Sequence, residues 1–285
     1  MSLLFSALSA LAYGSADFLG GVGTRRNPAY AVLIWSQLIG LLVALFFALF
    51  VGNAFEGSGE SGTWPAVDLA WGAAAGLAGA AGIIFLYHAL AHTVASIASP
   101  IAAVVGASIP IVAGVLFGER PEPIVWIGVA LAFPAILLLS ADRTQTIKIG
   151  SAVRLGLLAG GGFGLFFLFI SRTGEESGLW PLVSARVASV SVVASAALLS
   201  KRSIGLARGR MRVSVVGAGV LDMLANLFFL VASRSGLLVV ATIVTSLYPA
   251  PTVIFARVFF HERLSSTRIA GLLLAVAGVA LIGIG

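Results

Sequence analysis

The sequence contains no cysteine, and charged residues make up only 10% of its 285 positions. Without cysteine the chain forms no disulfide and performs no thiolate chemistry. Soluble domains carry about 25% charged residues, so this chain has too few charges to cover a surface in contact with water. Because 59% of the residues are hydrophobic and the mean hydropathy is +1.08, we expect its main solvent to be lipid.

Long apolar runs dominate what remains. A helix needs about 20 predominantly apolar residues to cross the hydrocarbon core of a bilayer. The sequence therefore predicts an all-α integral membrane protein with ten transmembrane helices. They are expected near residues 2–22, 28–52, 67–90, 94–117, 123–140, 151–172, 179–200, 213–233, 237–260 and 266–284.

The basic residues are distributed unevenly between the two sets of loops. Loops after odd-numbered helices hold 12 of the 17, namely Arg25, Arg26, Arg143, Lys148, Arg154, Lys201, Arg202, Arg208, Arg210, Arg212, Arg263 and Arg268. Loops after even-numbered helices hold only Arg120, Arg172 and Arg234. The positive-inside rule then predicts cytoplasmic odd-numbered loops and both termini outside, in a bacterial or archaeal plasma membrane. The basic stretch "KRSIGLARGRMR" lacks aromatic residues that would stack on bases, so no nucleic-acid partner is expected.

The two halves of the chain resemble one another at an offset of 143 residues. The matched positions are Gly76 with Gly219, Ala89 with Ala232, Glu119-Arg120 with Glu262-Arg263, and Gly128 with Gly271. Each half holds five predicted helices, and an odd number makes the second half enter the membrane from the opposite side. We expect two inverted repeats, at 1–140 and 151–285, joined by a loop at 141–150. Many secondary transporters are built this way, with the substrate site between the repeats.

Two predicted helices contain helix-breaking residues at corresponding depths. The fourth carries Pro100, Gly106 and Pro110, and the ninth carries Pro249 and Pro251. Broken backbone at membrane depth is tolerated where protein buries it or where it lines a wet cavity. We expect both helices to be interrupted at a binding site; the alternative is that the prolines only kink packed helices.

The duplicated five-helix unit, with a "GER" or "HER" turn before its last helix, resembles the EamA family of the drug/metabolite transporter superfamily. The resemblance covers essentially the whole chain. It implies a ten-helix carrier that moves small metabolites, often by export. It also points to termini inside the cell, whereas the distribution of charge predicts them outside.

Asp17 lies in the first predicted helix, one turn after Tyr13. Ala16, Asp17, Gly20 and Arg25 resemble the first helix of the small multidrug resistance carriers, although Asp replaces the usual Glu. That resemblance implies an acid that alternately binds a proton and a cationic substrate. The alternative is that Asp17 lies near the membrane face and pairs with Arg25 or Arg26.

Further polar residues interrupt the apolar segments, where ionisable groups are costly and usually face a cavity or a partner. Arg186 is predicted at a depth from which it reaches Asp222 or Asn226, and a purely structural Arg186–Asp222 pair and a substrate-binding role both remain open. Arg257 is expected to extend to the headgroups. His88 and His92 make an incomplete metal site, so no metal or cofactor is predicted. The remaining candidates for lining a cavity are Gln37, Tyr87 and Tyr248.

These features favour a secondary transporter that works by alternating access. We expect it to export an amino acid-like molecule or an organic cation in exchange for protons, with Asp17 or Asp222 as the proton-coupling group. A proton-independent facilitator or exchanger remains an alternative, as do a non-transporting membrane assembly protein and an intramembrane enzyme. The sequence has no HExxH, GxSxG or nucleotide-binding motif, which disfavours catalysis and ATP-driven transport. Both a monomer and a homodimer are compatible with the repeat.

Overall fold

The computed structural model describes residues 1–51, 66–92, 95–140, 149–199, 205–206, 210–261 and 264–284. The connecting loop predicted at 141–150 falls largely outside these residues, so that division of the chain stays a prediction. Glu262 and Arg263 of the second "ER" turn, and five further basic loop residues used in the charge count, also lie outside them. Every element within the described residues is a helix.

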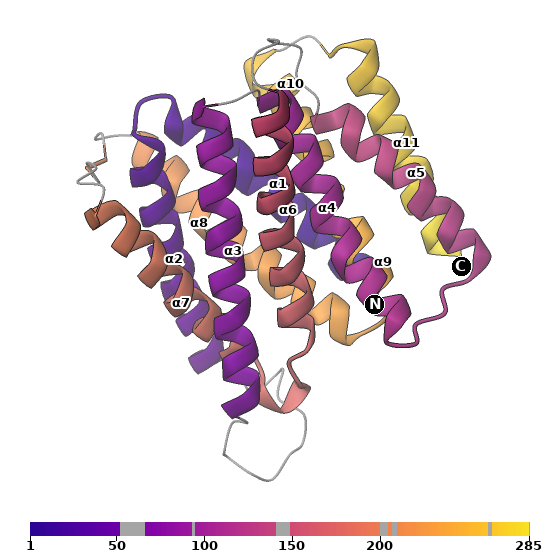
Figure 1. Cartoon of the computed structure of the whole chain (residues 1–285), viewed down its shortest axis with the longest axis horizontal. Coiled ribbons are helices and arrows are strands. Elements are labelled where there is room, and N and C mark those ends of the chain that lie inside the picture. Colours follow the sequence, from indigo (N-terminus) through magenta and orange to yellow (C-terminus); the bar gives the residue numbers. More distant parts are fainter. Residues whose placement is uncertain are drawn as a thin grey trace.

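The helices follow the predicted segments closely (Figure 1). In chain order they are α1 (Ser2–Thr24), α2 (Ala29–Phe50), α3 (Ala66–His92), α4 (Ala95–Leu116), α5 (Pro123–Ser140), α6 (Ile149–Ser171), the short 3₁₀ helix η2 (Glu175–Ser177), α7 (Trp180–Leu199), α8 (Arg210–Arg234), α9 (Leu238–Thr245), α10 (Pro249–Phe260) and α11 (Ser266–Ile284). Among the described residues, ten segments are long and apolar enough to cross a membrane, with α9 and α10 together forming one of them, Leu238–Phe260.

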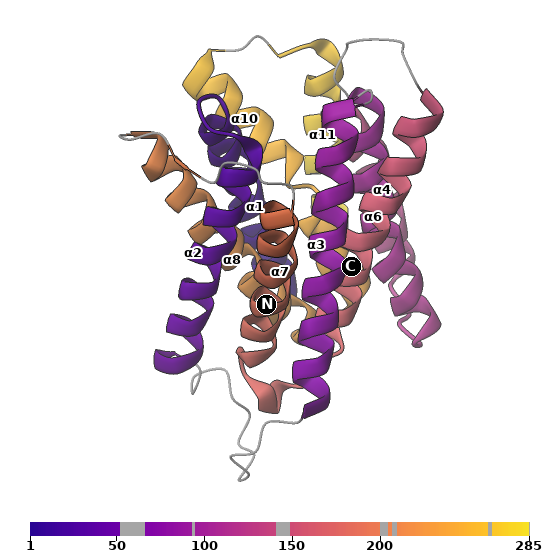
Figure 2. The ribbon, with the colours of Figure 1, turned by 60° about the vertical axis from the view of Figure 1, so that its left-hand side comes forward.

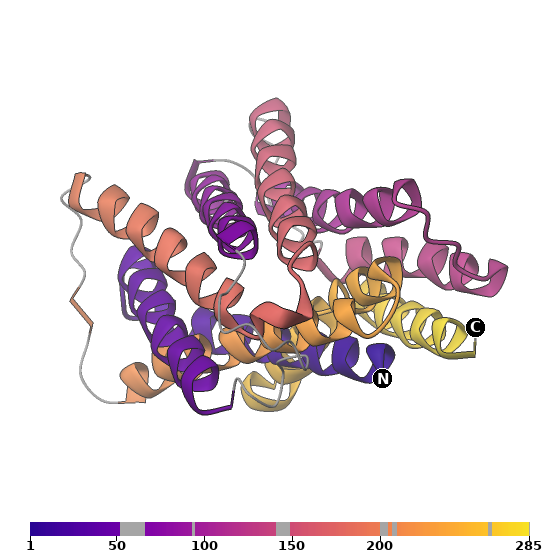
Figure 3. The same ribbon diagram turned by 90° about the horizontal axis from the view of Figure 1, so that it is seen from below.

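The packing of the helices repeats itself between the two halves. α1 packs on α8, and the equivalent contact in the other half joins α6 to α3. Likewise α3 packs on α7 as α8 does on α2, and α4 packs on α6 as α9 and α10 do on α1. Figure 2 shows α3, α4 and α6 grouped on one side, and Figure 3 shows both chain ends on the same side of the molecule. The inverted five-helix repeat is thus visible in the packing as well as in the sequence.

Two equivalent glycines permit the closest of these approaches. A Cβ on Gly76 of α3 would lie 2.0 Å from the carbonyl oxygen of Ala185 on α7, and one on Gly219 of α8 would lie 2.5 Å from that of Ser36 on α2. Both distances are shorter than any side chain tolerates, so each contact requires glycine. The repeat match of Gly76 with Gly219 therefore reflects one helix crossing that is used twice.

The structure differs from the sequence-based expectation in the fourth helix. α4 runs unbroken through Pro100, Gly106 and Pro110. Pro110 leaves the Gly106 carbonyl without its usual helical donor, but that oxygen packs against α6, 3.0 Å from where a Cβ on Gly164 would lie. Proline is tolerated within membrane helices where neighbouring helices surround it, and α4 continues without ending.

The ninth span does break. α9 ends at Thr245 and α10 begins at Pro249, with a tight turn through Tyr248 between them. Pro249 and Pro251 occupy the first turn of α10, where backbone N–H groups have no partner within the helix and proline is well tolerated. The break therefore falls just before the two prolines, and only this half of the expected matched pair of breaks is present.

Candidate functional site

A buried cation joins three helices near the middle of the bundle. Arg186 on α7 is buried, with its side chain 9% exposed, and it forms an ion pair with Oδ2 of Asp222 on α8. The same guanidinium donates a hydrogen bond to Oε1 of Gln37 on α2. The Asp222 side chain keeps 36% exposure, so this carboxylate pairs with Arg186 and still faces open space. Of the two partners considered for Arg186, the structure selects Asp222.

Asn226 and Gln37 are both buried close to this pair. Asn226 donates its amide to the backbone carbonyl of Asp222, 2.6 Å away on its own helix. Gln37 accepts from Arg186 and lies 3.4 Å from the hydroxyl of Ser189. Gln37 therefore supports the ion pair directly, whereas the hydrogen bond of Asn226 is to the backbone of its own helix. A direct contact of either amide with a substrate stays a prediction. Ser189 was not among the sequence candidates, because a serine one turn after Arg186 carries no distinguishing signal.

Asp17 of α1 faces the same region from the other side. It is exposed, although it lies well inside a membrane-length helix, and it is close enough to Asp222 to interact electrostatically. It forms no ion pair with Arg25 or Arg26 within the described residues; Arg25 instead stacks on Phe260, 3.7 Å from the ring centre. The structure thus favours the interior position for Asp17 over the pairing at the membrane face.

Three half-buried tyrosines accompany the two carboxylates. The ring of Tyr13 lies 6.2 Å from that of Tyr248 and 6.1 Å from that of Phe167 on α6. Tyr87 of α3 is within electrostatic range of both Asp17 and Asp222, and Tyr248 is within range of Asp17. The site therefore combines aromatic faces, one accessible carboxylate and one carboxylate already paired with an arginine.

The break in the ninth span places Tyr248 in this group. A Cβ on Gly14 of α1 would lie 2.5 Å from the Tyr248 carbonyl oxygen and 2.7 Å from Cβ of Pro251. The hydroxyl of Thr252 lies 3.1 Å from the carbonyl of Gly14, to which it donates. Glycine at position 14 lets the irregular backbone press directly on α1, one residue from Tyr13. The break consequently faces protein and the polar cluster.

Within the described residues, a group of polar contacts lies at one end of the bundle. We call this the terminal end, because the start of α1, the end of α11 and the ends of α2, α4, α6 and α8 lie there. Asp68 at the start of α3 accepts hydrogen bonds from the Gly174 backbone (3.0 Å) and the Ser177 hydroxyl. Arg234 at the end of α8 donates to the carbonyls of Gly174 (2.6 Å) and Gly178 (2.9 Å). The connection between α6 and α7 is thereby fixed to both α3 and α8.

Glu119 ties the two repeats together at the same end. Its carboxylate accepts from the backbone N–H groups of Leu238 (2.6 Å) and Val239 (3.0 Å), which begin α9. These are donors that a helix start leaves without partners. The sequence marked Glu119 as part of the repeated "GER" turn, but its partner lies on the other repeat and could not be found from spacing alone.

Other candidates lie apart from this cluster. His88 is exposed near the end of α3, and the side chain of His92 is outside the described residues, so the pair was not located as a site. Arg257 is exposed near the end of α10, with its guanidinium 3.5 Å from the His261 carbonyl. Gly160 of α6 packs against α4, since a Cβ there would lie 2.6 Å from the Ala102 carbonyl.

A helical bundle of two inverted repeats that encloses a charged aromatic cluster defines a membrane carrier. The model of the EamA-like transporter family matches residues 1–141 and again 150–284, and the chain belongs to that family. It is therefore a membrane transporter of the drug/metabolite type. A solved structure described as "Crystal structure of protein" is similar over 99% of this chain and 96% of its own, with a TM-score of 0.77 and 16% identity, which shows the shared fold. A comparison with curated proteins finds no match.

Proposed function

We propose that the protein is a secondary transporter that moves a small organic cation across the membrane in exchange for protons. The observation that carries the proposal is the accessible Asp17 carboxylate. It lies near three tyrosines and near the ion pair of Arg186 and Asp222, whose opposite charges cancel. Arg186 and Asp222 together contribute no net charge, so Asp17 leaves the site with one negative charge. Tyrosine faces and a carboxylate attract a cation together.

Proton exchange follows from the position of the acid. A carboxylate in a low-dielectric interior is costly as an isolated ion, and either a proton or a cationic substrate removes that cost. Competition between the two for Asp17 couples movement of one to return of the other. Asp222 is the second proton-coupling candidate, because its carboxylate remains partly exposed. Export is the direction in which inward proton flow would drive the substrate.

An amino acid-like substrate is the second candidate. Arg186 is the observation in its favour, since a guanidinium binds a carboxylate bidentately. Such a substrate would have to displace Asp222 from Arg186, with Asp17 holding the amino group. A cation needs no such rearrangement, which is why we place it first.

Alternating access is supported by polar contacts that join the repeats at one end of the described part of the bundle. Asp68 and Glu119 bind the repeats to one another at the terminal end, and Arg234 holds the connection that Asp68 contacts from within the second repeat. We propose that this is the closed end and that the polar cluster communicates with the opposite end in this state. From the positive-inside count the opposite end is cytoplasmic and both termini are outside; activity of a reporter fused to the C-terminus measures this directly.

Replacing Glu119 by Gln is expected to loosen the terminal end. The amide keeps one acceptor oxygen for two backbone donors, so we expect the free energy of unfolding to fall by about 1.5–3 kcal/mol. Since the chain has no cysteine, a Ser246→Cys background reports access cleanly: Ser246 is buried just after α9. A membrane-impermeant thiol reagent applied at the terminal end should label it faster in the Glu119→Gln variant. Glu122→Gln, at an exposed neighbour, is the control, and equal labelling in both would reject the closing role.

Counterflow in proteoliposomes tests the proposed function. Liposomes that contain the purified protein are loaded with unlabelled phenylethylamine. Uptake of the labelled amine is then followed with and without a proton gradient, and phenylalanine serves as the zwitterionic probe. We expect accumulation of the amine that depends on the gradient. Amine flux that does not depend on the proton gradient would support a proton-independent facilitator or exchanger. Preferential flux of phenylalanine would support the amino acid-like substrate. Folded protein that moves neither probe, or that releases a chemical product, would contradict the carrier.

A further inference from the structure

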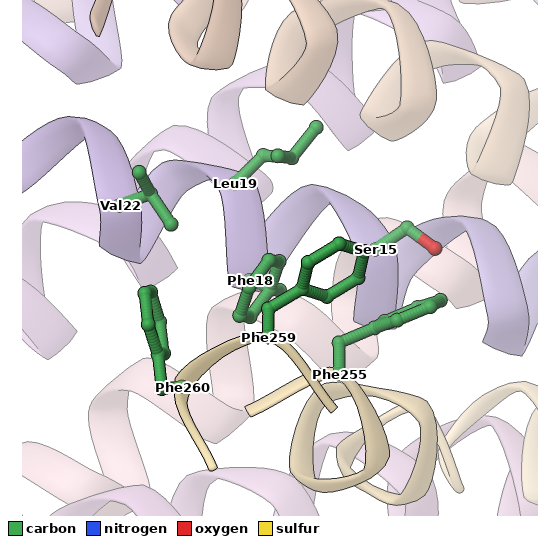
Figure 4. A pocket seen from close by; sticks show the side chains of 7 residues that line it. All are labelled: Ser15, Phe18, Leu19, Val22, Phe255, Phe259 and Phe260. Atoms are coloured by element: carbon green, nitrogen blue, oxygen red, sulfur yellow. The ribbon is translucent and has the colours of Figure 1, made fainter. Parts of the chain in front are cut away.

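An apolar hollow separates α1 from α10 beyond their contact at Gly14. Its volume is about 430 Å³, and its walls are Phe18, Leu19 and Val22 of α1 and Phe255, Phe259 and Phe260 of α10. Figure 4 shows the aromatic rings of the two helices facing one another across it. The Phe18 ring lies 5.2 Å from that of Phe260 and 5.5 Å from that of Phe259, so the hollow is bounded by mutually packed rings.

The hollow offers hydrocarbon and almost nothing else. Ser15 supplies its polar group, and the Ser15 hydroxyl already donates to the Leu11 carbonyl at 2.7 Å. An occupant of this part must therefore be apolar. The residues of α1 that line the hollow run from Ser15 to Val22, a rise of about 10 Å. Arg25 lies about 5 Å further along, so the hollow and Arg25 together span about 15 Å, which is half of a hydrocarbon core about 30 Å thick.

The cationic side chain of Arg25 lies at one end of the hollow. Arg25 follows the end of α1, is exposed, and holds its guanidinium 3.7 Å from the centre of the Phe260 ring, which is itself a wall of the hollow. Arg26 beside it is also exposed. A guanidinium binds phosphate bidentately, and at the level of the headgroups it meets the phosphates of lipids.

From this combination we propose that the α1–α10 hollow is a binding site for an anionic phospholipid, with one acyl chain along the packed phenylalanines that line it and the phosphate on Arg25. The acyl chain packs against both α1 and α10 beyond their contact at Gly14. α1 carries Asp17, and α10 begins directly after Tyr248. A lipid bound between them therefore stabilises the arrangement of the polar cluster. The proposal concerns a structural ligand and stands whatever substrate the carrier moves.

Native mass spectrometry of the full chain tests the site. Protein is released from micelles containing equal amounts of phosphatidylglycerol and phosphatidylcholine, and retained lipid is counted. We expect one phosphatidylglycerol on the wild type, at least fivefold less on Arg25→Gln, and none of either lipid on Val22→Phe, which fills the hollow. Arg172→Gln is the matched control, because Arg172 stacks on Phe117 at 4.6 Å and does not line the hollow.

Each other outcome counts against the proposal. Equal retention of both lipids by the wild type would remove the role of the headgroup. Wild-type retention by both Arg25→Gln and Val22→Phe would place the lipid elsewhere, and equal losses in Arg25→Gln and Arg172→Gln would reduce the effect to general surface charge. Thermal unfolding in phosphatidylcholine micelles, where no anionic lipid is present, establishes that the variants fold. There Arg25→Gln should unfold at the wild-type temperature, and in phosphatidylglycerol at a lower one.

Discussion

Replacement of Asp17 by Asn should reduce proton-driven flux of an organic cation to the level of empty liposomes. The substitution removes the charge that we assign to the substrate and the group that exchanges the proton, and it keeps the size of the side chain. Asp17 accepts no hydrogen bond from the described part of the chain and is exposed, so folding should not change. Flux is measured by counterflow, and the thermal unfolding temperature is measured on the same preparation.

Two companion variants make that result specific. Asp17→Glu keeps the carboxylate and should retain flux that responds to the proton gradient. Glu176→Gln removes an exposed acid at the membrane surface and should behave as the wild type. If Asp17→Asn carries the cation at the wild-type rate and still follows the gradient, coupling through this residue is wrong, and Asp222 becomes the group to examine.

The sequence indicated the site most clearly where a polar residue interrupts an apolar helix. Asp17, Arg186 and Asp222 stand out because lipid makes an unpaired ion costly, and that cost does not depend on how the helices pack. Tyr248 could be predicted as a site residue for a related reason, since two prolines close together must disturb a helix somewhere nearby. The free-energy cost of placing one charged residue or one proline in a membrane helix can be recognised from the sequence before the fold is known.

Features that depend on a partner from elsewhere in the fold could not be predicted from the sequence. α4 continues through Pro110, with the Gly106 carbonyl packed against α6, and the local sequence does not indicate that neighbour. The same holds for Glu119, whose two donors lie on the other repeat, and for Asp68 and Arg234, which bind the connection between α6 and α7. The environment of Glu119 and Asp68 is set by the way the inverted repeats come together, and that of Arg234 by the packing within the second repeat.

The Arg186–Asp222 pair allows the charge of the site to be changed in single steps. Counting each acidic or basic side chain that is present as one unit charge, the wild-type cluster carries a net charge of about −1, Asp222→Asn about 0, Arg186→Gln about −2, and the double variant about −1 again. If charge controls selection of a cation, affinity should fall about tenfold or more in Asp222→Asn and recover in the double variant. A tenfold change is about 1.4 kcal/mol, within the about 1–4 kcal/mol by which unit charges at 4 Å interact.

Stability should follow a different order in the same four proteins. Removing one member of a buried pair costs about 3–5 kcal/mol, and because Asp222 is 36% exposed we expect the lower value, about 3 kcal/mol, for Arg186→Gln. The double variant should lose less than the sum of the single losses, with a coupling of about 0.5–3 kcal/mol, while Arg172→Gln at an exposed position should change little. Cation binding and unfolding are measured in the same detergent. Affinity that falls in proportion to stability would make the pair purely structural, whereas recovery of affinity in the double variant separates the charge of the site from the integrity of the fold.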